Sequence, residues 1–294
     1  MSLRLEMLQV ARLASTLLGP DACDLVESFT RSRQNADGGF QDRDGSSDLY
    51  YTSFAVDILT ALQRFDSPTA ELIAGYLRGK EPAQLDFVHA ACLARLLSAT
   101  QGNQEAVDAA LARLEAFRSG EGGYHQAAQS EAGSCYACFL AYGAYADHGR
   151  EPPNPEGIAV CLNQLAQPNG GWTNDSVFPV PNIPATAAAV ALSRNLRLGI
   201  ATGTASFLLQ SFHAESGGFL PFPGAPMPDL LCTAVALHAL DGLQADFSNV
   251  KEPCLDFLDT LWTAEGGFYG QWDDDNLDLE YTYYGLLALG HLAL

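Results

Sequence analysis

The sequence predicts an all-α protein in which helix pairs repeat around a ring. The first observation is a Gly-Gly-aromatic turn that occurs five times, beginning at Gly38, Gly122, Gly170, Gly217 and Gly266. From the second turn onward the steps are 48, 47 and 49 residues, whereas the first step is 84 residues, close to two shorter periods. A sixth, degenerate repeat without its glycine pair therefore lies between the first two turns. A fixed period of this length indicates a repeat architecture.

The second observation is that two kinds of helix alternate between these turns, with no sustained strand pattern. Helices with charged faces precede the glycine pairs and are expected at 67–79, 103–120, 154–166, 204–215 and 251–265, after leading helices at 2–17 and 22–34. Helices that are apolar nearly all round follow them and are expected at about 48–64, 84–99, 133–147, 183–196, 228–243 and 278–293. A helix without a polar face is buried or lines a cavity. Residues 1–294 are therefore expected to form one domain, with six outer helices around six inner ones and a central cavity.

Composition and charge limit the classes of function. Hydrophobic residues make up 48% of the chain, but the longest apolar stretches are far shorter than a membrane span. The N-terminal segment is amphipathic and does not resemble a signal peptide. Seven cysteines without disulfide spacing predict reduced thiols and a cytoplasmic protein. The formal net charge of −20 argues against nucleic acid and anionic membranes as partners.

Gly-Gly-aromatic turns at this period, each followed by an apolar helix, resemble the superfamily of protein prenyltransferase β-subunits and squalene/terpene cyclases. The resemblance extends from about residue 20 to the end of the chain. It implies an (α/α)6 toroid, an isoprenoid ligand and, for the β-subunit-like members, a helical α-subunit partner. The motif is structural, because the glycines permit a tight turn, and it does not identify the reaction.

The zinc site that the resemblance implies for prenyltransferases is incomplete here. Those enzymes hold zinc through Asp and Cys of one repeat and His of the last. In the last repeat, DLEYTYY from Asp278 places Tyr281 where the histidine belongs. Asp229 and Cys232 are one residue too far apart, and Cys135 follows Gly133 where an aspartate is expected. The cofactor is left open between zinc and magnesium.

Acidic strings provide a second candidate chemistry. The Asp-x-Asp-Asp acid motif of class II cyclases does not occur, and its nearest counterpart is the loop sequence Asp273-Asp274-Asp275. The same carboxylates match an Asp-Asp-x-x-Asp pattern that ends at Asp278. Oxygen ligands of this kind suit Mg²⁺ or Ca²⁺. The alternative interpretation is a solvated loop in which Asp278 caps the last helix.

The first and last repeats are expected to meet when the ring closes. GGFQDR resembles a prenyltransferase turn whose arginine contacts isoprenoid diphosphate, which makes Arg43 a candidate anion ligand. Its alternative role is to pair with the acids of the same rim. The sequence DLYYT from Asp48 echoes DLEYT from Asp278. Asp48, Asp278 and Tyr281 are therefore the candidate catalytic residues.

Aromatic side chains on the predicted inner helices favour an apolar, aromatic-lined pocket. Such a pocket suits an isoprenoid chain, and ring faces stabilise carbocations. Together with Arg43, the candidate ligand-binding residues are Tyr50, Tyr51, Phe54, Tyr136, Phe139, Tyr283 and Tyr284. Each of them could instead serve packing alone.

Three hypotheses on function follow. The leading one is a prenyltransferase/terpene cyclase-like protein that binds an isoprenoid, its diphosphate or a similar apolar ligand, with prenyl transfer or cyclisation as the reaction if it is an enzyme. The second is a non-catalytic toroid that acts as a binding or scaffold protein. The third is a glycan-acting enzyme on a similar barrel, which would need a pair of carboxylates across the cavity.

Overall fold

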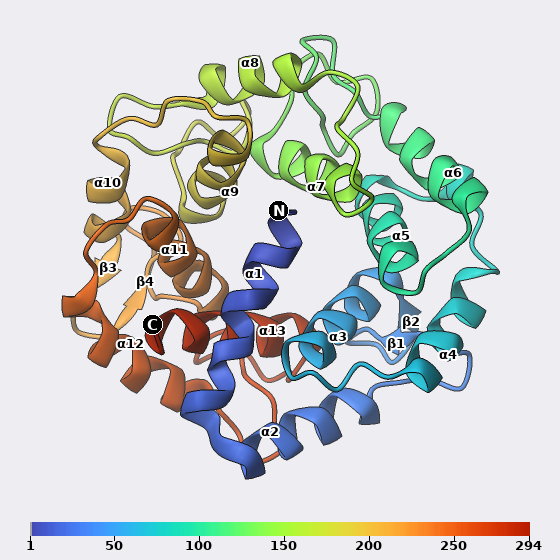
Figure 1. Cartoon of the computed structure of the whole chain (residues 1–294). Coiled ribbons are helices and arrows are strands. Elements are labelled where there is room, and N and C mark those ends of the chain that lie inside the picture. Colours follow the sequence, from blue (N-terminus) through green and yellow to red (C-terminus); the bar gives the residue numbers. More distant parts are fainter. Residues whose placement is uncertain (1) are drawn as a thin grey trace.

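The structure, a computed structural model that describes residues 2–294, is a closed ring of two helical layers (Figure 1). Within this part of the chain the inner layer consists of α3 (Leu49–Ala61), α5 (Phe87–Ala99), α7 (Cys135–Ala146), α9 (Ile183–Asn195), α11 (Leu230–Gly242) and α13 (Leu279–Leu292). The outer layer consists of α2 (Ser15–Ser32), α4 (Ser67–Leu77), α6 (Gln104–Glu115), α8 (Pro155–Leu165), α10 (Thr204–Gln210) and α12 (Ser248–Leu261). The predicted all-α toroid of six helix pairs is confirmed.

Short elements complete the chain. They are α1 (Leu3–Ala11), the 3₁₀ helices η1 (Arg12–Ala14) and η2 (Pro82–Gln84), and the strands β1 (Phe40–Gln41), β2 (Ser47–Asp48), β3 (Phe212–His213) and β4 (Gly218–Phe219). The strands pair as antiparallel hairpins, β1 with β2 and β3 with β4. In the degenerate second repeat, η2 occupies the connection where the other repeats have the glycine pair.

A repeated hydrogen bond fixes each aromatic turn to the inner helix that follows it. The N–H of Phe40 donates to Thr52 Oγ1 at 2.9 Å, and the Thr52 hydroxyl donates to the carbonyl oxygen of Asp48. Cys138 Sγ accepts from the N–H of Tyr124 in the third repeat. The same contact recurs in the pairs Trp172–Thr186, Phe219–Thr233 and Phe268–Thr282. A side-chain acceptor near the start of the helix, threonine in four repeats and cysteine in one, thus sets the register between turn and helix.

The glycine pairs let each turn press against the outer helix of the next repeat. A Cβ at Gly38 would collide with the carbonyl of Leu72 on α4, and the Cα of Gly39 lies against the ring of Tyr76. The last turn makes the corresponding contact with the first outer helix, because a Cβ at Gly266 would collide with the carbonyl of Leu25 on α2. The ring is therefore closed by the same backbone contact that joins successive repeats.

Helix α1 crosses the centre of the ring and closes one end of it (Figure 1). Its Leu3 and Met7 are buried, and Arg4 Nε donates to the fully buried Asp57 Oδ1 of α3 at 2.6 Å. Arg95 of α5 approaches the other oxygen of Asp57 at 3.5 Å. Removal of one partner from a buried ion pair is costly, so this contact anchors the helix in place. The inner helices begin at the opposite, open end.

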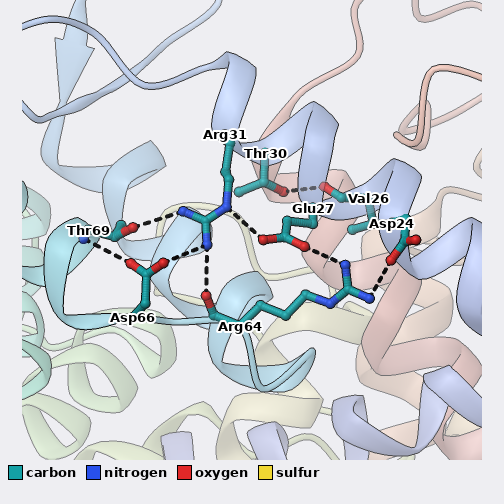
Figure 2. A network of polar contacts seen from close by, with 8 residues as sticks. All are labelled: Asp24, Val26, Glu27, Thr30, Arg31, Arg64, Asp66 and Thr69. Atoms are coloured by element: carbon teal, nitrogen blue, oxygen red, sulfur yellow. Dashed lines mark hydrogen bonds and ion pairs between the residues drawn. The ribbon is translucent and has the colours of Figure 1, made fainter.

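A polar network joins α2 to α4 on the outside of the ring (Figure 2). Arg31 Nε donates to Glu27 at 2.7 Å, and its Nη atoms donate to Thr69 Oγ1 and to the carbonyl of Arg64. Arg31 also pairs with Asp66, which caps α4. Several donors of one guanidinium thus hold neighbouring outer helices and the loop between them in a fixed arrangement.

The N-terminal segment differs from the prediction of helices at 2–17 and 22–34. Helix α1 ends at Ala11, and α2 is kinked at Gly19, which has φ of +74°. Pro20 follows the kink and starts the straight part of the outer helix, where its missing N–H costs no hydrogen bond. The chain thereby turns from the closed end into the outer layer.

We expect Gly266→Ala to lower the free energy of unfolding by about 3 kcal/mol, because φ of +91° strains an L-residue and the new Cβ meets the Leu25 carbonyl. Gly149→Ala is the matched control, because its φ is +65° and nothing lies within 4 Å of the new Cβ. The control should lose about 1 kcal/mol. Equal losses in urea-induced unfolding would contradict the role given to the ring-closing contact.

Candidate functional site

The open end of the ring is lined by the N-caps of the inner helices. Asp48, Asp86, Asp229 and Asp278 each accept a backbone N–H of the helix they precede, while Ser134 and Asn182 do the same for α7 and α9. A carboxylate suits a helix N-terminus because it complements the positive end of the macrodipole. The caps therefore give the mouth of the ring an acidic rim.

Arg43 bridges the first and last repeats at this rim. Its Nε donates to Asp278 Oδ2 at 2.8 Å, and its Nη2 lies 2.7 Å from the same oxygen and 3.0 Å from Asp274 Oδ2. The guanidinium also lies 5.8 Å from the centre of the Tyr281 ring. Burial raises the pKa of Asp278, while the backbone N–H of Tyr281 and Arg43 act against that rise. The positive charge of Arg43 is thus already opposed by two carboxylates.

His89 joins the first two inner helices at the same rim. Its Nε2 lies 2.8 Å from Asp48 Oδ2 and its Nδ1 lies 2.7 Å from Asp86 Oδ2. The hydrogen bond with Asp48, followed by the one with Asp86, raises the pKa of His89 to about 9 despite partial burial. At neutral pH the ring is therefore an imidazolium that donates to both carboxylates. Asp48 thus pairs with His89 and also caps α3.

A cavity of about 280 Å³ lies inside the ring between the rim and α1. Its aromatic lining comes from α3, α7 and α13, with Tyr50, Tyr136, Phe139 and Tyr284. Its small side chains are Ala187, Ala188 and Ala191 of α9. Met7 of α1 contributes to the lining at the closed end. Leu231 and Pro184 line both this cavity and an outer depression of about 430 Å³ that contains Arg43 and Asp229. The small alanine side chains thus leave an apolar chamber beside the aromatic rings and next to the mouth.

Glu280 is the carboxyl group of this chamber. It lies two residues after the cap of α13 and accepts a hydrogen bond from the Tyr50 hydroxyl at 2.6 Å. Burial raises the pKa of Glu280 to about 7, and the hydrogen bond from Tyr50 only partly offsets this. The raised pKa keeps a share of the molecules in the neutral carboxylic acid form at neutral pH, and this form can donate a hydrogen bond to a ligand oxygen.

The sequence-predicted ligand residues divide into those that line the chamber and those that do not. Tyr50, Tyr136, Phe139 and Tyr284 line it. Phe54 packs edge-on against Tyr50 with ring centres 4.9 Å apart. Burial and the carboxylate of Asp278 raise the pKa of Tyr51 to about 12, which reflects its position at the rim.

Tyr283 lies outside the chamber lining and is buried on another side of α13. The charges nearest its hydroxyl are those of Asp57, Arg95 and Arg4 at the closed end. Successive helix residues are separated by about 100° around the axis, so Tyr284 can face the chamber while Tyr283 does not.

The three predicted metal-binding aspartates do not converge. Asp274 is paired with Arg43, Asp273 faces the outer depression, and Asp275 faces a separate depression of about 240 Å³ beside Leu277. Within residues 2–294 no group of three or more His, Cys, Asp or Glu side chains is arranged to hold a metal ion. These carboxylates therefore do not form one oxygen-rich site.

The residues at the zinc positions also do not fit zinc. Asp229 accepts the backbone N–H of Cys232 at 2.6 Å as the cap of α11. Burial raises the pKa of the Cys232 thiol well above its ordinary value, and burial likewise raises the pKa of Tyr281. Tyr281 offers a phenol where zinc sites of this kind use imidazole, and Asp229 already accepts a backbone N–H, so these three residues do not supply the zinc donor set.

Sequence reasoning missed Glu280 and a buried histidine pair, His238 and His291, whose Nδ1 and Nε2 are 3.0 Å apart. One sequence feature could have revealed all three residues, because each is an ionisable residue within a largely apolar helix. Such residues are rarely buried without a partner. The partner of Glu280 is 230 positions away in the sequence, and that of His238 is 53 positions away.

We expect the pKa of Glu280 to appear in the pH dependence of stability. Its folded pKa of about 7 exceeds the ordinary value of 4.5, so its contribution to stability is complete below pH 4.5 and is lost as the pH rises to about 7. The variant Glu280→Gln does not titrate and therefore does not lose this stability. We expect the variant to gain about 2 to 3 kcal/mol in free energy of unfolding relative to the wild type between pH 4.5 and pH 8. Glu71→Gln, on the exposed face of α4, is the control and should show no such trend. A pH-independent difference for Glu280→Gln would contradict the raised pKa.

Comparison with known proteins identifies the ring. The family model described as prenyltransferase alpha-alpha toroid domain matches residues 21–74 and 185–293, more than half of the chain. A search of curated proteins finds no significant match. No helix in the described part of the chain is long and apolar enough to cross a membrane.

Solved structures share the fold at low sequence identity. Protein geranylgeranyltransferase-I of Candida albicans, complexed with GGPP, is 12% identical, with 92% of this chain and 90% of that chain covered and a TM-score of 0.67. A variant of the type II terpene cyclase MstE from Scytonema, in complex with geranylgeranyl dihydroxybenzoate, is 11% identical, with 97% and 98% covered and a TM-score of 0.64. An inactive variant of an α-1,6-mannanase from Salegentibacter is 13% identical, with 93% and 98% covered and a TM-score of 0.65. The fold alone therefore hosts several chemistries, and the matching family model shows that the chain belongs to the prenyltransferase alpha-alpha toroid domain family.

Proposed function

We propose that the chain binds a short acyclic isoprenoid in the central chamber, with its oxygen-bearing head at Glu280 and its hydrocarbon tail toward Met7. The observation that carries this proposal is the chamber itself, with its apolar and aromatic lining and a carboxyl group near the open end. Apolar pockets with few polar groups are typical ligand sites. The geranylgeranyl compounds held by two proteins of similar fold support an isoprenoid as the ligand class.

The volume of the chamber favours a short chain. A cavity of about 150 Å³ in another protein accommodates benzene. By the same scale, about 280 Å³ accommodates roughly ten carbon atoms. A ten-carbon chain is therefore expected to fit best, whereas a twenty-carbon chain would have to project through the mouth.

The charge of the mouth favours a neutral head group over a diphosphate. Arg43 would have to exchange Asp278 and Asp274 for the phosphates, while Asp229 and Asp273 line the same depression. Like charges this close are repulsive. The neutral carboxyl of Glu280 can instead donate to an alcohol or carbonyl oxygen.

The chemistry of the site supports binding more strongly than the two reactions of the family. Prenyl transfer by way of a zinc thiolate requires a zinc donor set, and Tyr281 lacks the imidazole that this set needs beside Asp229 and Cys232. Cyclisation that starts with alkene protonation requires an acid far stronger than a carboxyl with a pKa of about 7. Asp48 and Asp278, the candidate catalytic acids, are engaged by His89 and Arg43. A binding protein that retains the toroid is therefore the better-supported form of the proposal.

The cysteines support a reducing environment. Each of the seven is buried and unpaired, and burial raises the thiol pKa at Cys254 and Cys92 to about 12. Buried thiols of this kind behave as small hydrophobic side chains. We therefore propose a cytoplasmic location.

The test is thermal unfolding with a series of alcohols, geraniol, farnesol and geranylgeraniol, and with geranyl diphosphate. A ligand at about 100 times its Kd adds roughly 2.7 kcal/mol, which raises the Tm of a domain of this size by about 5 to 10 °C. We expect the largest rise with geraniol and a smaller one with its diphosphate. A larger rise with the diphosphate would return Arg43 to the role of anion ligand, and no rise with any compound would favour the scaffold hypothesis.

Met7→Ala should move the chain-length preference toward farnesol, because it removes the side chain that closes the chamber at α1. The same unfolding series measures the shift. Leu5→Ala is the matched control on the same helix, since Leu5 is 46% exposed and does not line the chamber. If both variants keep the preference for geraniol, the tail does not reach α1.

A further inference from the structure

A histidine pair that the proposed function does not use extends from the chamber wall into the protein interior. His238 of α11 lines the chamber, and its Nδ1 lies 3.0 Å from Nε2 of His291 on α13. His291 is fully buried, and its Nδ1 faces Asp241 Oδ2 at 3.7 Å. Asp241 is half-exposed at the end of α11, so the three side chains run from the surface to the chamber.

Both imidazoles are neutral at neutral pH. Burial lowers the pKa of His238, and burial together with the neighbouring His238 lowers the pKa of His291 to about 2. A neutral imidazole has one nitrogen that donates and one that accepts. The hydrogen bond between the rings therefore contains one proton, which belongs either to His238 Nδ1 or to His291 Nε2. Its position decides whether Nε2 of His238 is a hydrogen-bond acceptor or a donor toward the chamber.

The carboxylate of Asp241 favours one of the two assignments. Its Oδ2 lies 3.7 Å from Nδ1 of His291, which is longer than a hydrogen bond and leaves that nitrogen without a hydrogen-bond partner. The negative charge nevertheless attracts an N–H and repels a lone pair, so it favours the proton of His291 on Nδ1. Nε2 of His291 is then an acceptor, and Nδ1 of His238 must donate to it. The remaining nitrogen of His238, Nε2, is left with a free lone pair as the acceptor that meets a ligand.

We infer that His238 Nε2 is a hydrogen-bond acceptor for a hydroxyl group at the far end of the ligand, with Asp241 and His291 as positioning residues that fix its tautomer. This inference rests on the proposed function and narrows its ligand class to isoprenoids that carry oxygen at both ends. An acceptor buried among apolar side chains disfavours a ligand that leaves it unpaired.

The charges around the pair favour a neutral donor over a cation. They come from four elements and comprise Glu6 of α1, Arg194 of α9, Asp241 of α11 and Lys251 of α12. Glu6 and Arg194 form an ion pair with a distance of 2.6 Å. The two negative and two positive charges sum to zero, so the surroundings carry no net negative charge that would favour an ammonium group.

The spacing along the helices matches a chain of about ten carbons. Glu280 lies two residues after the cap of α13, and His238 lies nine residues after the cap of α11. Seven residues of difference correspond to roughly 10 Å along the axis at 1.5 Å per residue. An extended ten-carbon diol thus places one hydroxyl at Glu280 and the other at His238.

The test compares geraniol with 8-hydroxygeraniol, which differs by a hydroxyl at the far end, in calorimetric titrations of the full chain. We expect the wild type to bind the diol at least tenfold more tightly than geraniol. His238→Leu should abolish this preference while geraniol still binds, and Asp241→Ala should reduce it. Glu252→Ala, at an exposed position on α12, is the control and should leave the preference unchanged.

A second measurement reads the tautomers directly and does not depend on the stability of the His238 variant. In ¹⁵N NMR spectra of the wild type, His238 and His291 should both carry their proton on Nδ1, and Asp241→Ala should change the state of His291. A proton on Nε2 of His238 would overturn the inference, as would equal affinity for the two ligands. If neither ligand binds, the proposed function fails as well, whereas binding of geraniol without a preference for the diol overturns this inference alone.

Discussion

The close backbone contact between each Gly-Gly turn and the next outer helix is the constraint on which the rest of the structure depends. Any side chain at Gly38 or Gly266 would push the turn away from the carbonyl of Leu72 or Leu25. Because the last turn repeats this contact with α2, the ring closes without a special element. The hydrogen bond from each Gly-Gly-aromatic turn to a threonine, or to Cys138 in the third repeat, then sets where the following inner helix begins, so the helix N-termini meet at one end.

That arrangement places charged groups at the open end of the ring and apolar groups farther inside. Caps of the inner helices bring carboxylates to the open end, where Arg43 and His89 neutralise part of their charge. Below them the helices are apolar, and alanines on α9 leave room for a chamber beside the aromatic side chains. Helix α1 closes the other end through Met7 and the buried pair of Arg4 with Asp57. Apart from tyrosine hydroxyls, the polar side chains of the chamber lining are Glu280 and His238, so these two have a large effect on what can bind.

The sequence allowed the ring and its inner helices to be predicted, because glycine pairs and apolar helices recur at a fixed period. It did not allow a prediction of which face of an inner helix meets the chamber. A helix that is apolar on all sides has no polar face that would show which side points to solvent or to a cavity. The sequence therefore did not indicate which of Tyr283 and Tyr284 faces the chamber. The partners of Glu280 and His238 depend on the packing of helices that are distant in sequence. An N-terminal helix was predicted, but the sequence did not show that α1 closes one end of the ring, because this position depends on tertiary contacts with α13 and α3.

The most direct test of the account is the position of the bound ligand. The chain contains three methionines, so ¹³C-methyl labelling gives few signals, and an isotope-filtered NOE experiment with geraniol can identify the methyl group next to the tail. The account predicts cross-peaks between the terminal methyl groups of geraniol and the Met7 methyl. Binding with cross-peaks to Met227 alone, or with no methionine contact, would place the ligand on the loops or in the groove between α4 and α6 and would contradict a chamber site.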